Sequence, residues 1–158
     1  MEELEKRMYF FVPYQLTGIQ QGIQCGHAVE QYAHKYKDDI EYIDFVENWK
    51  TWVVLNGGTT NNNLENPGTL NVIHRSLIDN YIKCKSFYEP DLNDALTAIC
   101  FICDERVFNK EKYPDFEDLM LKSVYESQSI TNYDQWIEFI GGEQNLFLRE
   151  LLKGKRLA

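Results

Sequence analysis

Hydrophobic and polar positions along this chain follow two different periods, and their alternation predicts an α/β fold. Compact apolar or β-branched runs have the length of buried strands, and the segments between them repeat apolar residues at helical spacing. Strands that alternate with helices in this way are typical of a sandwich built on a mixed sheet. The predicted strands are 8–14, 51–55, 86–88 and 95–103, and the predicted helices are 17–37, 38–49 and 69–82.

The pattern changes after Asp104, where the strands stop and short amphipathic segments follow, separated by turn signals. We therefore predict two parts: an α/β core over residues 1–107 and a helical C-terminal extension over 108–158 that packs on the core. The segments of the extension are 116–125, 133–140 and 144–152.

The first helix has an unusual spacing of glycines. Thr17 can cap its N-terminus, and Gly18, Gly22 and Gly26 then recur every four residues, on one side of the helix. A glycine inside a helix costs about 1 kcal/mol relative to alanine. The repetition predicts that the backbone of a neighbouring segment approaches this side closely.

A row of polar side chains follows the same helix. Gln20, Gln24, His27 and Gln31 are spaced by four, three and four residues, so they lie near one another on its surface. A strand that leads into a helix with such a row is a candidate position for a functional site.

Composition and charge narrow the classes of protein. The chain has 158 residues, of which 44% are hydrophobic, and it carries a net charge of −9. No apolar run approaches the roughly 18 residues of a membrane span, and the acidic N-terminus lacks the pattern of a secretory or transit signal. We expect a cytoplasmic protein without a membrane partner. The negative charge opposes general binding of nucleic acid, although local basic patches remain.

Cofactor motifs are absent from the sequence. Its four cysteines do not make a disulfide scaffold at this length, and Cys100 and Cys103 have no second Cys or His pair to complete a zinc site. The loop 56–68 is rich in glycine and asparagine but lacks the lysine of a phosphate-binding loop. The sequence therefore predicts no metal or other cofactor.

Three segments are expected to converge at one end of the sheet. They are the first helix with His27, the acidic turn with Asp91, and the start of the last strand with Thr97. Open α/β sheets bind ligands in crevices at strand ends, so these three side chains are predicted to share a cleft.

Two of these segments resemble a known family. QCGHA (24–28) and EPDLNDALTAI (89–99) are similar to motifs of the type II peptidyl-tRNA hydrolases, and the resemblance covers residues 8–105. It implies a three-layer-like sandwich with a mixed four-stranded sheet flanked by helices, and a possible homodimer. It also implies hydrolysis of the ester that joins a peptide to the terminal ribose of tRNA.

The resemblance implies catalytic roles for three residues, because His27, Asp91 and Thr97 stand at the corresponding positions of the family. Gln20 stands where the family has a lysine. Gln20 and Gln24 are candidates for substrate binding because they lie in one row with His27. A water activated by Asp91 or His27 would attack the ester carbonyl. Thr97 and the Gln20 amide would then stabilise the oxyanion or the ribose.

Other interpretations of these residues remain open. His27 could be a helix histidine satisfied by a backbone carbonyl, Asp91 a turn carboxylate, and Thr97 an ordinary strand residue. The protein would then be a catalytically impaired member that binds a partner protein or a nucleotide-like ligand, or a homodimeric scaffold. The expected partner is accordingly a tRNA ester or, alternatively, a protein.

Overall fold

A four-stranded sheet forms the centre of the fold, which a computed structural model describes for residues 3–121 and 130–158. Its strands are β1 (Lys6–Val12), β2 (Trp52–Asn56), β3 (Cys84–Glu89) and β4 (Ala95–Asp104). Their order is β2-β1-β4-β3, with β1 and β2 parallel and β3 and β4 antiparallel, so the sheet is mixed. The predicted α/β fold class is confirmed.

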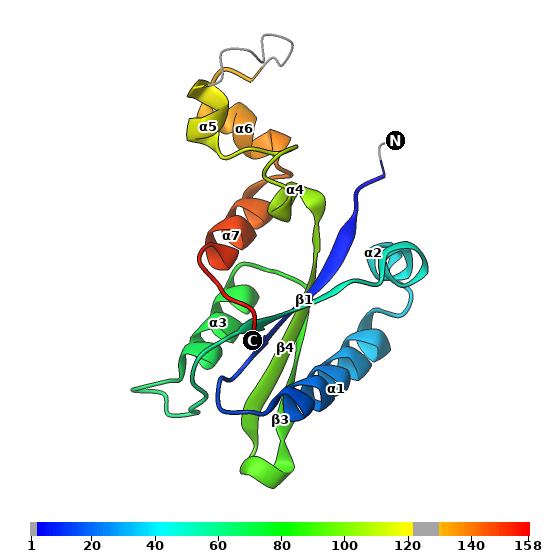
Figure 1. Cartoon of the computed structure of the whole chain (residues 1–158), viewed down its shortest axis with the longest axis vertical. Coiled ribbons are helices and arrows are strands. Elements are labelled where there is room, and N and C mark those ends of the chain that lie inside the picture. The colour runs from blue at the N-terminus through cyan, green and yellow to red at the C-terminus, as the bar shows by residue number, and fades with distance from the viewer. Residues whose placement is uncertain (1–2, 122–129) are drawn as a thin grey trace. The chain divides into compact units, whose positions relative to one another are not determined.

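Helices cover both faces of the sheet. The sequence between the strands forms α1 (Gly18–Tyr36), α2 (Ile40–Asp44), a π-helical turn η1 (Phe45–Trp49), α3 (Thr69–Asp79) and a 3-10 turn η2 (Pro90–Leu92). The helices α1 and α3 lie on opposite sides of the sheet (Figure 1). The helix predicted over 38–49 is thus divided into α2 and η1. The one predicted over 69–82 ends at Asp79, because the chain turns left-handed at Tyr81 (φ 59°).

Alternation along the central strands separates the two faces. In β1, Met8, Phe10 and Val12 join the core that packs against α1, together with Ala28 and Tyr32 of that helix. The intervening side chains face the other way. There the rings of Tyr9 and Phe11 stack on Phe101 with centroids 6.1 and 6.0 Å apart.

The C-terminal tail covers the outer edge of β2. The Asn56 N–H donates to the Arg156 carbonyl oxygen (2.9 Å), the Ala158 N–H donates to the Val54 carbonyl oxygen (3.0 Å), and Leu157 forms an antiparallel bridge. A free sheet edge exposes unpaired N–H and C=O groups, which this tail satisfies. The sequence did not predict this pairing.

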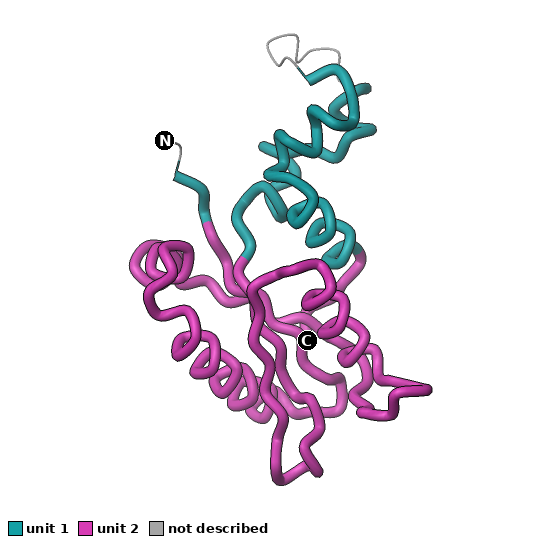
Figure 2. Tube along the Cα trace, turned by 180° about the vertical axis from the view of Figure 1, so that it is seen from behind, with its two compact units in different colours: residues 1–5, 103–153 teal, residues 6–102, 154–158 magenta. Residues whose placement is uncertain are grey.

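The chain divides into two compact units (Figure 2). One consists of residues 6–102 and 154–158, and the other of 103–153 with the described N-terminal residues 3–5. The second unit contains helices and has a core in which Leu119, Trp136 and Ile140 are buried. The part of the segment predicted over 116–125 that follows residue 121 lies outside the described residues. The helices described in this second unit are α4 (Glu105–Phe108), α5 (Phe116–Leu121), α6 (Tyr133–Phe139) and α7 (Glu143–Leu152).

The glycines of α1 do not have the expected role. A Cβ atom built at Gly18, Gly22 or Gly26 would meet no described atom within 4 Å. No described segment therefore approaches this side of the helix, and the prediction of a close backbone neighbour is wrong for these residues.

None of the helices in the described part of the chain combines the length and the apolar composition that are needed to cross a bilayer.

Candidate active site

A β-bulge turns Thr97 toward α1. In β4, Ala98 and Cys100 belong to the core beneath α1, so regular alternation would point Thr97 to the α3 side. The register between β3 and β4 shifts between Phe87 and Tyr88, however, and leaves Thr97 as the extra residue. Bulges re-aim a side chain in this way, and the Thr97 hydroxyl therefore reaches the α1 side of the sheet.

Gln24 connects Thr97 to a carboxylate at the end of β3. The Thr97 hydroxyl donates to Gln24 Oε1 (2.5 Å), and Gln24 Nε2 donates to Glu89 Oε2 (2.9 Å). Only 7% of Gln24 and 1% of Thr97 are exposed. A buried amide needs partners for both of its ends, so this chain of hydrogen bonds fixes the Gln24 side chain.

Glu89 is the charged end of this chain. Its second carboxylate oxygen, Oε1, accepts from the Asp91 N–H (3.2 Å) and caps η2. The hydrogen bond from Gln24 and then that from the Asp91 backbone hold the pKa of Glu89 below its ordinary value, with a further contribution from His27. Glu89 therefore carries a negative charge at neutral pH.

His27 lies one helical turn beyond Gln24, at the boundary with solvent. Its ring stacks on Phe87 with centroids 4.5 Å apart, and its Nδ1 lies 3.8 Å from Glu30 Oε2. The side chain is 40% exposed. The imidazole is thus held against the sheet by one face while its edge remains accessible to water.

Gln20 does not join this group. Its Oε1 accepts from the Thr17 N–H (2.9 Å), and Thr17 Oγ1 accepts from the Gln20 N–H (3.3 Å). This reciprocal pair is a capping box, which satisfies backbone donors at the start of a helix. Gln20 is therefore a capping residue in this structure, and a lysine could not accept the same hydrogen bond.

The predicted site residues are brought together in part. Gln24 and Thr97 are in direct contact and His27 lies beside them, whereas Asp91 contributes its backbone N–H and its exposed carboxylate has no hydrogen bond or ion pair within the described part of the chain. The carboxylate next to Gln24 belongs to Glu89, which sequence reasoning passed over in favour of Asp91. Alternation along β3 could have indicated Glu89, because residues two apart in a strand lie on the same face of the sheet. Glu89 is two residues from Phe87, on which His27 stacks.

The arrangement suits proton transfer at a solvent boundary. An accessible imidazole can serve as a general acid or base, and the nearby Glu89 carboxylate can stabilise its protonated form. His27 is not among the residues that line the cavities of about 510 and 500 Å³. No group of three or more potential metal ligands occurs among residues 3–121 and 130–158.

Replacement of Thr97 tests the hydrogen-bond chain. Thr97→Val keeps the shape of the side chain but leaves the buried Gln24 Oε1 without its donor, which typically costs about 1–3 kcal/mol of unfolding free energy. Thr97→Ser keeps the hydroxyl and is the matched control. Urea unfolding of both variants is the measurement, and equal stability of the two would show that this hydrogen bond contributes nothing.

Comparison with known proteins adds no family assignment: no protein-family model and no curated protein matches this chain.

Proposed function

We propose that this protein is a hydrolase of the peptidyl-tRNA hydrolase type, a divergent member of that family that cleaves a carboxylic ester on the terminal ribose of tRNA. Two features support the proposal. One is the resemblance of segments 24–28 and 89–99 to the motifs of the family. The other is the spatial meeting of Gln24, Glu89 and Thr97, which come from those same segments.

The observation that carries the proposal is the placement of His27. It lies within the electrostatic reach of Glu89, a carboxylate that two hydrogen bonds keep ionised, and it remains accessible to water. The stacking on Phe87 holds the ring of a general base at this position, and the negative charge of Glu89 can stabilise its protonated form.

The proposed reaction uses water as the nucleophile. His27 accepts a proton from a water molecule as the oxygen attacks the ester carbonyl, and the protonated imidazole then returns the proton to the departing ribose hydroxyl. Glu89 stabilises the positive charge of the ring between these steps. Thr97 is buried and bonded to Gln24, so it acts as a positioning residue that holds Gln24 and, through it, Glu89.

Release of an acylated amino acid from tRNA tests the proposal. The full chain is incubated with N-acetyl-aminoacyl-tRNA, and the acid-soluble acyl product is followed under multiple-turnover conditions. We expect release above the spontaneous rate with this ester. A rate equal to the spontaneous one at every protein concentration would contradict the proposed activity.

Gln20→Lys is expected to raise this activity while it weakens the helix cap. The ammonium group supplies a charge-assisted contact to the substrate, which is about twice as strong as a neutral hydrogen bond. It cannot accept from the Thr17 N–H, so a lower midpoint of thermal unfolding is expected as well. Gln21→Lys adds the same charge one residue away, and an equal gain from that variant would show that only net charge matters.

A second function is favoured by one observation, the use of Gln20 as a capping residue. Without a cation at this position, and with a net charge of −9, the protein could bind a partner protein or nucleotide-like ligand instead of cleaving an ester. A pull-down from cell extract distinguishes the two, because a binding protein retains its partner protein while a hydrolase retains tRNA.

A further inference from the structure

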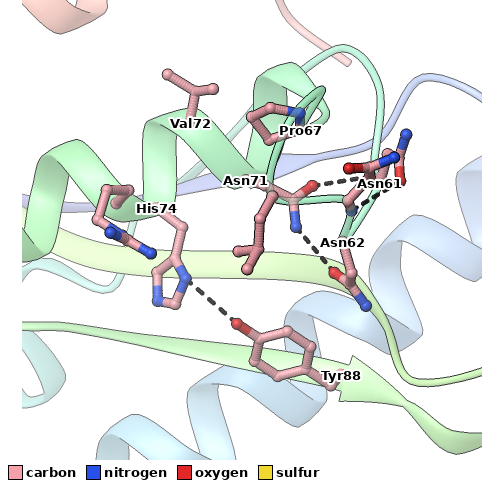
Figure 3. A pocket seen from close by; sticks show the side chains of 10 residues that line it. Asn61, Asn62, Pro67, Asn71, Val72, His74 and Tyr88 are labelled. Carbon is pink, nitrogen blue, oxygen red and sulfur yellow. Dashed lines mark hydrogen bonds between the residues drawn. The ribbon is translucent and has the colours of Figure 1, made fainter.

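A polar cavity lies on the opposite side of the sheet from His27, between α3 and the loop that precedes it (Figure 3). Its volume is about 510 Å³, within the usual range of small-molecule sites. Asn61 and Asn62 contribute to it from the loop, Asn71 and His74 from α3, and Tyr88 from β3. The loop is the glycine- and asparagine-rich segment 56–68, for which the proposed hydrolase gives no role.

The asparagine wall of the cavity is fixed by its own hydrogen bonds. Asn71 Oδ1 accepts from the Asn61 N–H (2.9 Å), and Asn71 Nδ2 donates to Asn62 Oδ1 (3.0 Å). Asn62 Nδ2 in turn donates to the Asp94 carbonyl oxygen (3.1 Å). Gly68 supports the same wall, since a Cβ there would lie 2.5 Å from the Thr59 carbonyl oxygen. The loop is therefore preorganised rather than shaped by a ligand.

The opposite wall consists of two rings. Tyr88 Oη lies 3.4 Å from His74 Nδ1, and the ring centroids are 6.3 Å apart with the rings near perpendicular. Burial, and next the charge of Arg75, lower the pKa of His74, so its imidazole is neutral at neutral pH. The Tyr88 side chain is 43% exposed despite its position in a strand, and a planar ligand can therefore reach its ring.

The charge of the cavity is opposite to that of the protein. The chain contains 25 acidic residues. None of the ten described residues that line this cavity is acidic. Arg75 is the one charged side chain in the lining, and no ion pair with a described carboxylate involves it. An arginine at the rim of a pocket without carboxylates attracts an anionic group, and its planar fork suits phosphate.

We propose that this cavity binds a nucleotide, either free or as the terminal unit of an RNA chain. The base stacks on Tyr88, the phosphate pairs with the Arg75 guanidinium, and the amides of Asn62 and Asn71 contact the edge of the base with their remaining N–H groups. Stacking on an aromatic ring does not discriminate between bases. The fixed amide N–H groups are donors, so they favour bases with hydrogen-bond acceptors at their edge. The inference stands on this cavity alone and does not depend on the proposed hydrolase activity.

Isothermal titration of the full chain with adenosine 5′-monophosphate tests the proposal. We expect saturable binding, weakened about tenfold or more by Arg75→Gln because a charge-assisted contact is lost. Tyr88→Leu is expected to weaken binding at least about fivefold through loss of stacking, whereas Tyr88→Phe keeps the ring and the affinity. Circular dichroism of each variant shows whether the fold is retained.

Arg156→Gln is the matched control, because it removes an exposed arginine that lines a different cavity, of about 500 Å³. It should leave binding unchanged, and a loss with Arg156→Gln but not with Arg75→Gln overturns the proposal. Adenosine and inorganic phosphate should each bind more weakly than the nucleotide, and equal binding of inorganic phosphate also overturns it. Tighter binding of a trinucleotide RNA than of the free nucleotide assigns the site to RNA ends, and the reverse order assigns it to free nucleotides.

Discussion

His27→Ala is expected to remove most of the ester hydrolysis. A positioned general acid or base typically contributes about 10²–10⁴-fold to a rate, so kcat/KM on N-acetyl-aminoacyl-tRNA should fall by that order. The loss should appear in kcat, because His27 acts in the transition state and contributes little to substrate binding. Steady-state kinetics of the variant beside the unchanged chain is the measurement.

His34→Ala is the control for this prediction. His34 lies on the same helix, seven residues beyond His27, and its side chain is exposed. Its removal should leave kcat/KM within about twofold, as is usual for a surface position whose substitution changes stability little. If the two variants were equally active, His27 would not be the general base.

Asp115→Ala is expected to give the largest loss of stability. In the helical unit, the Arg149 side chain is buried, with 2% exposed, and its Nη2 donates to Asp115 Oδ1 (2.6 Å). Its Nη1 donates to the Arg106 carbonyl oxygen (2.8 Å), while Nε has no partner among the described residues. Removal of Asp115 therefore leaves a buried guanidinium without a counter-charge.

The expected cost is about 2–3 kcal/mol of unfolding free energy, below the roughly 3–5 kcal/mol of a fully buried pair. The expected cost is lower than that of a fully buried pair because the Asp115 side chain is 45% exposed. Lys110→Ala removes the other cation that contacts Asp115, at an exposed position, and should cost at most about 1 kcal/mol. Urea unfolding followed by fluorescence measures both, and equal effects of the two variants would contradict the importance of the buried arginine.

Local patterns were sufficient to predict most of the fold. Three local signals each depend only on residues close in sequence: the apolar run before Thr17, the cap at Thr17 and the β-branched run at 51–55. The strand or helix that each signal predicts appears close to its predicted position. The period of a segment determines which of its faces is buried, so the α/β class followed from the sequence.

Non-local pairing accounts for what the sequence did not reveal. The bulge at Thr97 arises from the register between two strands, and the tail that pairs with β2 meets it across a hundred residues of sequence. The cap that Gln20 forms with Thr17 is a local contact, and the predicted row of polar side chains did not reveal it.

His27, Glu89 and Gln24 are proposed to form one hydrolytic site. A single-turnover experiment tests this claim most directly, with the protein in excess over N-acetyl-aminoacyl-tRNA, because slow product release then cannot conceal the chemical step. We expect complete release of the acyl group in one exponential phase that disappears in His27→Ala. Persistence of the intact ester on tRNA that is bound to the protein would contradict it.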